Sequence, residues 1–249
     1  MPFRISALTH VGAVRTSNED ALAIEGRLIA HTEFGPTRYD SEGGRCVLML
    51  ADGMGGHAQG ALASKIALSS LIASSRNASG ETDWFDALDR ANDAVYDLME
   101  QLPSARGMGT TVAGTVSNGA SLLHFNVGDS RTYLYSSGCL LQLSHDDVPL
   151  SSRRSGPHRQ SHQITQSLGG LSRRTGIRPH IGTIQLPAVG DVVLLCSDGL
   201  TDIVEDAAIA AAIGSTFDLD QCVSALLRMA MAGGGNDNIS IILARRSDE

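Results

Sequence analysis

Four acidic clusters occupy predicted loops of this chain and are the residues best suited to chemistry: Asn18-Glu19-Asp20, Asp52-Gly53, Asp198-Gly199 and Asp237-Asn238. The apolar runs CVLMLA and VVLLCS end directly before Asp52 and Asp198, and the run ISIILA follows Asp237-Asn238. A carboxylate at the end of a buried strand is costly to desolvate unless a cation meets it, although a single Asp before Gly is also a common turn residue. The turn interpretation is the better one for any single cluster, whereas the set of clusters favours a cation site.

These oxygen ligands indicate both the cation and its chemistry. Three aspartates at the same ends of the sheets would repel one another and raise at least one pKa, unless divalent cations neutralise them. Without a Cys or His cluster at zinc spacing, the ligands favour hard cations such as Mg²⁺ or Mn²⁺. Two such ions about 3.5 to 4 Å apart can lower the pKa of a bridging water and clamp a phosphoryl group for in-line attack. Gly53 allows the backbone to approach an ion closely and to offer its carbonyl oxygen.

Arg15 lies four residues before Glu19, in the segment GAVRTSNEDA. A guanidinium binds two phosphate oxygens through parallel hydrogen bonds and compensates charge that the cations leave. Taken alone, Arg15 would be interpreted as a surface residue. Beside the acidic clusters it becomes a candidate for binding the phosphate.

The composition excludes several classes of protein. The counts of 19 Lys plus Arg and 27 Asp plus Glu give a net charge of −8, which argues against nonspecific binding to nucleic acid or to an anionic membrane. The amino terminus has neither the apolar core of a signal peptide nor about 18 apolar residues able to span a bilayer. The four cysteines form no CxxC pair and are expected to be small core residues in a reducing compartment. We therefore expect a cytoplasmic protein.

The elements that position these clusters are predicted from periodicity and turn signals. Residues 46–51 predict a buried strand, 58–76 and 84–102 two helices, and 109–143 an antiparallel meander with Asn118-Gly119 as its strongest hairpin cue. The remaining predictions are an exposed loop at 151–163, strands at 181–186 and 191–196, a helix at 218–231 and a last strand at 239–244. No stretch resembles a linker, and there is no regular βαβ alternation. We expect one α+β domain over residues 1–249, built on antiparallel sheet.

Seven motifs, in order over nearly the whole chain, resemble those of the protein phosphatase 2C family, the metal-dependent serine/threonine phosphatases, and particularly its compact bacterial members. They are GAVRTSNEDA at 12–21, LADGMGGHAQG at 50–60, MGTTV at 108–112, NVGDSR at 126–131, ITQSLGG at 164–170, LLCSDGLTD at 194–202 and GNDNISIIL at 235–243. A single Asp-Gly pair carries no weight, but seven motifs in the family's order argue strongly against coincidence.

The resemblance implies a four-layer αββα sandwich, with two central antiparallel β-sheets flanked by helices. It also implies two divalent cations, Mn²⁺ or Mg²⁺, at one end of the sandwich. By motif position, Asp52 would bridge both ions. Asp198 and Asp237 would complete one of them, and Glu19 with the Gly53 carbonyl would hold the other.

Three further roles follow from the same resemblance. Asp20 would orient ligands or metal-bound water. Arg15 would bind the substrate phosphate. Asp129, in NVGDSR, could join Asp198 at a third, weaker metal position described for bacterial relatives.

Two departures from the family pattern matter. Many eukaryotic relatives read DGHxG, with a His proposed to protonate the leaving oxygen, where this chain has Met54. Bacterial members share that Met, so the general acid stays open between the nearby His57 and metal-bound water. In place of the family's Asp-His-Ser-like segment this chain has SHDDVPL and then a short stretch rich in Arg and Ser. The flap, at about 145–165, is expected to be truncated, so target preference cannot be transferred.

The leading hypothesis is hydrolysis of phosphoserine and phosphothreonine in proteins by metal-bound hydroxide, without a covalent intermediate. No GxSxG pattern suggests acyl transfer. A non-catalytic binding module is disfavoured because a degenerate homologue would be expected to lose some of the acids, which are all present: Glu19, Asp20, Asp52, Asp198 and Asp237. A phosphohydrolase of small molecules stays open, since its dimetal chemistry would be the same. The expected partners are phosphorylated proteins, including a cognate serine/threonine kinase, and the chain is expected to be a monomer.

Overall fold

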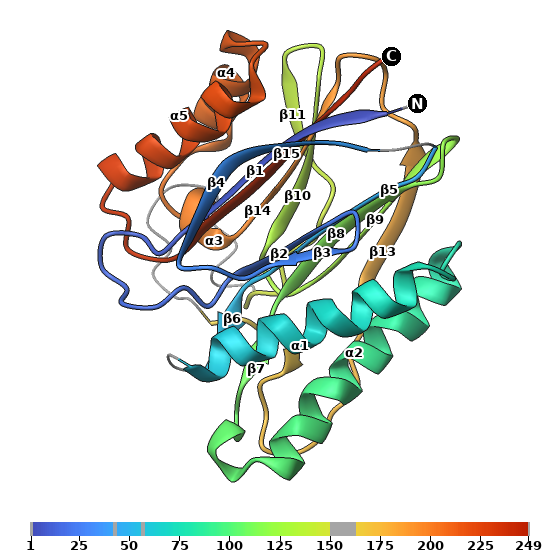
Figure 1. Cartoon of the computed structure of the whole chain (residues 1–249), viewed down its shortest axis with the longest axis vertical. Helices are drawn as coiled ribbons and strands as arrows, with labels where there is room; N and C mark the ends of the chain where they lie inside the picture. The colour runs from blue at the N-terminus through green and yellow to red at the C-terminus, as the bar shows by residue number, and fades with distance from the viewer. Residues whose placement is uncertain (1, 42–43, 56–57, 150–162, 249) are drawn as a thin grey trace.

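The computed structural model describes residues 2–41, 44–55, 58–149 and 163–248, and its strands form two six-stranded antiparallel sheets and one small sheet (Figure 1). The first sheet has the order β11 (Cys139–Gln142), β10 (Arg131–Ser136), β14 (Val192–Cys196), β15 (Ile239–Arg246), β1 (Phe3–His10) and β4 (Glu33–Asp40). The second sheet has the order β13 (His180–Gln185), β9 (Ser121–Val127), β8 (Val112–Ser117), β5 (Cys46–Ala51), β2 (Ala21–Ile24) and β3 (Arg27–Ile29). The small sheet joins β12 (Leu168–Gly169), β7 (Gly109–Thr110) and β6 (Gly53–Met54).

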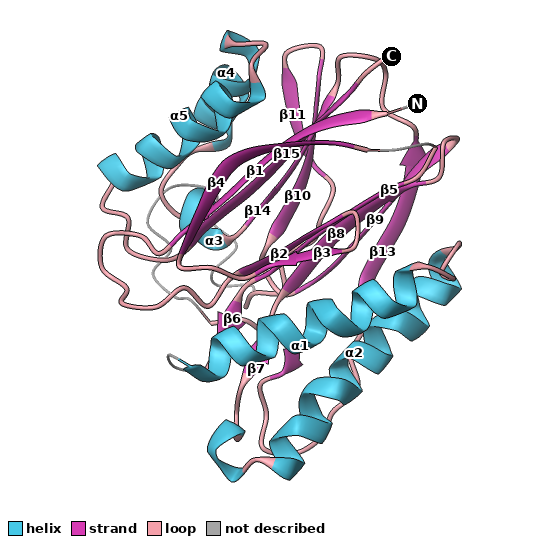
Figure 2. Ribbon diagram, viewed as in Figure 1, coloured by secondary structure: helices cyan, strands magenta, loops and turns pink. Residues whose placement is uncertain are grey.

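Helices cover the outer face of each large sheet (Figure 2). One side carries α1 (Ala58–Ser75) and α2 (Glu81–Gln101), followed by a 3-10 turn at Pro103–Ala105. The other side carries α3 (Asp198–Thr201), α4 (Asp206–Ser215) and α5 (Leu219–Ala232). Apolar residues between the sheets, such as Ile5, Leu48 and Leu195, form a separate core cluster. The layer order is therefore the predicted αββα.

The amphipathic pattern of α2 explains why this helix docks where it does. Its buried stripe includes Trp84 and Val95, and Trp84 stacks on Phe125 of β9 with ring centroids 4.8 Å apart. The helix begins three residues before the predicted start because Asp83 Oδ2 accepts hydrogen bonds from the backbone N–H of Ser79 at 2.8 Å and of Gly80 at 3.3 Å. Such capping satisfies donors that the first helical turn leaves unpaired.

The predicted meander over 109–143 forms both of its outer hairpins, β8–β9 and β10–β11, but is wrong at the step between them. Residues Asn118-Gly119 do turn β8 into β9, as the hairpin cue indicated. At Gly128, with φ of 101°, the chain then crosses to the other sheet, so that β10 pairs with β11 and β14 rather than with β9. Turn residues show where a chain reverses, but they do not show which sheet the next strand will join.

Two expectations from composition can be compared with the structure. Cys46, Cys196 and Cys222 are buried, whereas Cys139 is exposed at the start of β11, and all four are free thiols. Within the described ranges, no helix is both long and apolar enough to cross a membrane.

Candidate active site

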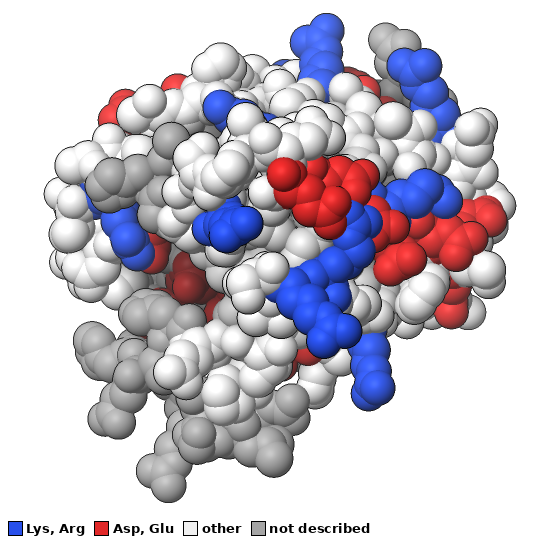
Figure 3. Space-filling view, turned by 90° about the horizontal axis from the view of Figure 1, so that it is seen from below, with Lys and Arg blue, Asp and Glu red and all other residues white. Residues whose placement is uncertain are grey.

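A pocket of about 360 Å³ brings together residues that flank the strands of both large sheets and residues of the small sheet. It is lined by Arg15, Glu19, Asp52, Gly53, Met54, Gly55, Thr111, Asp129, Ile164, Asp198, Asp237 and Asn238. Every predicted site residue except Asp20 lies on its wall. The view from below shows acidic side chains within a hollow on that face (Figure 3).

Asp52 directly follows the buried strand β5 and is held through its backbone. Its carbonyl accepts hydrogen bonds from Thr110 Oγ1 and from the Thr111 N–H, both at 2.9 Å. Its own N–H donates to Thr111 Oγ1 at 3.2 Å. The two threonines belong to the motif MGTTV and hold the backbone of Asp52 in place. Apart from that motif, nothing in the sequence indicated this role.

Glu19 is fixed by contacts with three elements. Its carbonyl accepts hydrogen bonds from Ser64 Oγ of α1 at 2.7 Å and from the Gly53 N–H of β6 at 3.2 Å. Its N–H donates to Asn238 Oδ1 at 2.8 Å. A Cβ atom added at Gly60 would lie 1.8 Å from Glu19 Oε2, so only glycine fits beside this carboxylate.

Asn238 joins two of the acidic clusters, which the sequence analysis did not anticipate. Its Nδ2 donates to the carbonyls of Val11 at 2.9 Å and Ser17 at 3.0 Å, and its backbone N–H donates to Asp237 Oδ1 at 2.8 Å. Together with the bond to Glu19, these contacts hold the loop before β2 against the loop before β15. In the sequence, the feature that could have indicated this role was the amide of Asn238 next to Asp237 in GNDN.

Asp198 and Asp20 both neighbour Ser197, the first along the chain and the second through a hydrogen bond. Asp198 is the first residue of α3, directly after Ser197. The Ser197 hydroxyl donates to Asp20 Oδ2 at 2.9 Å and accepts from the Ser240 N–H at 3.0 Å. Asp20 is 2% exposed, and its Oδ1 has no hydrogen-bond partner among the described residues. A buried carboxylate oxygen without a donor fits a site that awaits a cation or an ordered water.

Arg15 reaches across the pocket to one of the predicted ligands. Its Nη2 donates to Asp237 Oδ2 at 2.7 Å, and this hydrogen bond raises the pKa of Arg15. The Arg15 side chain is 53% exposed and the Asp237 side chain 26%. An ion pair this exposed contributes little stability, so the guanidinium can leave Asp237 at small cost.

The electrostatics of the pocket favour positive charge. Burial raises the pKa of Asp52 well above its usual range, and the charges of Asp20, Asp198 and Asp237 raise it further. Burial likewise raises the pKa of Asp20 to about 7, although the hydroxyl of Ser197 opposes this shift. Among the described residues, no three acidic, His or Cys side chains stand as ready ligands of one ion. Asp237 is paired with Arg15.

The donor set nevertheless fits hard divalent cations. The pocket offers five carboxylates and the Gly53 backbone against a single guanidinium, and oxygen ligands are those that Mg²⁺ and Mn²⁺ prefer. Asp129 is 4% exposed and also lines the pocket, and its role at a third cation position stays a prediction.

The residues of the motif LADGMGGHAQG that bear on proton donation are Met54 and His57. Met54 lines the pocket and has no proton to donate, whereas His57 and most of the predicted flap lie outside the described residues.

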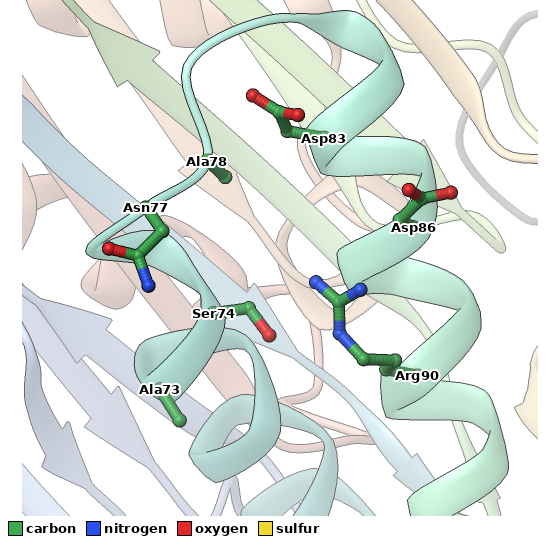
Figure 4. Close-up of a pocket in the computed structure, with 7 residues that line it drawn as sticks. All are labelled: Ala73, Ser74, Asn77, Ala78, Asp83, Asp86 and Arg90. Carbon is green, nitrogen blue, oxygen red and sulfur yellow. The ribbon is translucent and has the colours of Figure 1, made fainter.

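A second hollow, of about 410 Å³, lies between the end of α1 and the start of α2 (Figure 4). Its Asp83 is engaged in the α2 cap, and none of the predicted site residues borders it.

Comparison with known proteins identifies the family. Residues 37–229 match the protein phosphatase 2C family. The protein phosphatase PhpP of Streptococcus pneumoniae is 32% identical to this chain, covering 98% of each sequence. The chain therefore belongs to the protein phosphatase 2C family, which confirms the resemblance of the seven motifs.

Solved structures agree with this membership. The crystal structure of the Mycobacterium tuberculosis serine/threonine phosphatase PstP is 30% identical, with a TM-score of 0.80 over 99% of this chain and 100% of that one. The whole PstP sequence is longer, and this chain spans 44% of it. A structure of the PstP catalytic domain in complex with two manganese ions is also 30% identical, with a TM-score of 0.79 and complete coverage of both chains. The predicted fold class is thereby confirmed.

Proposed function

We propose that this protein hydrolyses phosphoserine and phosphothreonine in other proteins, using water activated by two divalent cations, Mn²⁺ or Mg²⁺. The observation that carries the proposal is the meeting of five carboxylates, from five segments distant in sequence, with one arginine in a single pocket. Membership of the protein phosphatase 2C family, and the manganese ions bound by the PstP catalytic domain, support it.

The division of the carboxylates between the two ions follows their positions in the family motifs. Asp52 would bridge the ions, with Glu19 and the Gly53 carbonyl on one side and Asp198 with Asp237 on the other. When bound, the cations supply a nucleophilic water of lowered pKa and neutralise phosphoryl charge. Asp129 would hold a third, weaker ion.

Arg15 and Asp20 would act on the substrate and on the ligands. Arg15 would exchange its bond to Asp237 for two phosphate oxygens, because a cation on Asp237 competes for the same carboxylate. Asp20, held by Ser197, would orient ligands or bound water from behind. Hydrolysis would then proceed by direct attack of water on phosphorus, without a covalent enzyme intermediate.

The substrates of this family are phosphoproteins, and we propose that they include targets of a cognate serine/threonine kinase. The monomeric state, the cytoplasmic location and the single domain over 1–249 with its short flap stay predictions. A panel of phosphopeptides and metabolite phosphates would separate a protein phosphatase from a phosphohydrolase of small molecules, which is expected to prefer the metabolites.

The assignment is tested by Asp198→Asn and Asp237→Asn. Each variant keeps its shape but loses a ligand charge, so hydrolysis of a phosphothreonine peptide is expected to be abolished with the fold intact by circular dichroism. Asp191→Asn is the matched control, because Asp191 Oδ2 accepts from the Ala188 N–H in a turn before β14, and Asp191 does not line the pocket. Near-normal turnover in both ligand variants would sink the assignment.

A further inference from the structure

Asp147 is a largely buried carboxylate that ties three distant segments together. Its Oδ2 accepts hydrogen bonds from the Gly128 N–H at 2.9 Å and from Gln166 Nε2 at 2.8 Å. Its Oδ1 lies 2.9 Å from His180 Nε2. Its backbone N–H donates to the Gly128 carbonyl at 3.0 Å, and its carbonyl accepts from the Thr165 N–H at 2.7 Å. Both carboxylate oxygens and both backbone groups are therefore engaged.

Two of these segments form walls of the acidic pocket. Gly128 directly precedes Asp129, and Ile164 directly precedes Thr165; Asp129 and Ile164 both line the pocket. The turn at Gly128 is tightly packed, since a Cβ atom there would lie 2.6 Å from Cγ2 of Thr111, which clamps Asp52. Asp147 thus connects the segment that carries Asp129 with the segment that carries Ile164, and so sets the position of one relative to the other.

The third segment completes this support from β13. His180 lies opposite Asn126 in the β13–β9 pairing, and its ring lies 4.8 Å from the ring of His145. Asn126 holds the His145 backbone by accepting from its N–H at 3.0 Å and donating to its carbonyl at 2.8 Å. Side chains on β9 and β13 therefore hold both His145 and Asp147, so the SHDDVPL segment is anchored to the second sheet.

The neighbouring Asp146 has a different partner and shows what is particular to Asp147. Asp146 pairs with Arg131 of β10, with Nη2 to Oδ2 at 2.8 Å, and so anchors the segment to the first sheet. Neither Asp146 nor Arg131 lines the pocket. Asp147 is the acid of this pair whose hydrogen bonds lead to pocket walls.

We propose that Asp147 is a positioning residue for the catalytic pocket, which holds the Gly128-Asp129 turn against the segment from Ile164 to Gln166 and thereby keeps Asp129 in place as a cation ligand. His180 and Gln166 fix the carboxylate in the orientation that this requires. The proposal rests on the proposed function, because the role of Asp129 toward a cation is part of it.

The test compares Asp147→Ala and Asp147→Asn with the unaltered protein as Mn²⁺ is titrated. Asp147→Ala removes all side-chain bonds and is expected to raise the Mn²⁺ concentration for half-maximal turnover roughly tenfold, the usual effect of losing a group that orients a metal ligand. Asp147→Asn retains an acceptor oxygen for Gly128 and Gln166 and is expected to restore most of the affinity. Direct Mn²⁺ binding to the cation-free protein by calorimetry should show the same order, and it decides the matter even if no phosphopeptide is hydrolysed.

A double-mutant cycle separates positioning from general destabilisation. Asp129→Ala is expected to give a similar shift, and the double variant no larger shift than either single one, because both changes remove the same ligand. Asp83→Asn, which alters a carboxylate with three hydrogen bonds at the α2 cap, should lower the melting temperature without moving the Mn²⁺ dependence. Additive shifts, or a wild-type Mn²⁺ dependence in folded Asp147→Ala, would overturn the proposal. Should that variant fail to fold, Gln166→Ala takes its place, with a smaller shift expected and an absent shift overturning the proposal.

Discussion

At the residue scale, Glu19 and Asp52 are held mainly by hydrogen bonds to their backbone atoms. Thr110 and Thr111 clamp Asp52, and Ser64 with Asn238 clamp Glu19. Both residues line the pocket. Substitutions of these side chains should therefore change the chemistry of the site more than the fold around it.

Arg15 offers the clearest separation of binding from stability. Arg15→Ala is expected to raise the KM for a phosphothreonine peptide roughly 10- to 100-fold, the loss of hydrogen bonds to a charged group worth about 1.5–3 kcal/mol. The melting temperature should hardly change, because the bond to Asp237 is an exposed ion pair worth at most about 1 kcal/mol. Steady-state kinetics and thermal melts of the same preparation measure both effects.

Arg15→Lys serves as the graded control. Lysine keeps the charge but not the pair of parallel donors, so its KM should fall between those of wild type and Arg15→Ala. An unchanged KM in Arg15→Ala would show that the phosphate binds elsewhere.

At the element scale, the first turn of α1 is pressed against the site. Gly60 lies in that turn, where an added Cβ atom would meet Glu19 Oε2 at 1.8 Å and the Gly53 carbonyl carbon at 2.8 Å. The helix thereby sets the place of a predicted ligand side chain and of a predicted ligand carbonyl together. Only the absence of a side chain at Gly60 permits this approach.

Gly60→Ala is accordingly expected to lower activity by more than its small loss of stability can explain. Alanine favours the helix by about 1 kcal/mol, while overpacking costs about 1–3 kcal/mol, so a small net loss of stability is expected. Turnover should fall at least tenfold, with a higher Mn²⁺ requirement, because Glu19 and Gly53 are both displaced. Thermal melts and Mn²⁺ titration of activity at a temperature where the variant is folded provide the measurement.

Ser69→Ala, on the exposed face of the same helix, is the matched control and should keep wild-type activity. Full activity in Gly60→Ala would mean that the helix and Glu19 can separate without harm. The Gly60 contact would then have no bearing on catalysis.

At the scale of the whole molecule, elements defined by local sequence patterns could be predicted, whereas pairings between distant segments could not. The strand at 46–51 and the helices over 58–76 and 84–102 were predicted because their apolar patterns are local, and Asp52 followed from the strand that precedes it. The assignment of β10 to the first sheet depends on its pairing with β14, about sixty residues later, which no local pattern records. The pairing of β1 with β15 joins the two ends of the chain and was likewise missed.

The same division applies within the site. Acidic residues after apolar strands could be recognised one at a time, and their order resembled that of a known family. The bridging role of Asn238 and the support given by Asp147 come from contacts between segments 19 or more residues apart, such as Asp147 with Gly128 and with His180. An amide or carboxylate in a loop carries no sequence signal for such a partner.

The acidic pocket should also govern how the stability of the whole protein depends on pH. The pKa of Asp20 is raised to about 7, and that of Asp52 is raised well above its usual range. A carboxyl with a higher pKa in the folded than in the unfolded state binds its proton more tightly when folded. In a chelator, stability should therefore fall as pH rises from about 4, the unfolded pKa, through about 7, the folded one. Thermal melts across this range, with chelator and with saturating Mn²⁺, test this.

A rise of stability with pH, caused by carboxyls whose pKa is lowered, occurs at lower pH and does not hide the predicted decline toward neutral pH. Asp83 and Asp218 have lowered pKa values because of hydrogen bonds from backbone N–H groups, so their stabilisation is lost only as the solution becomes more acidic than their usual range. Saturating Mn²⁺ should remove most of the decline toward neutral pH, since the cations bind the ionised carboxylates of the folded protein. Asp52→Asn should flatten the decline in chelator, because it removes one of the buried charges. A melting temperature that stays level or rises toward neutral pH in chelator would contradict the raised pKa values and, with them, the electrostatic argument for a cation site.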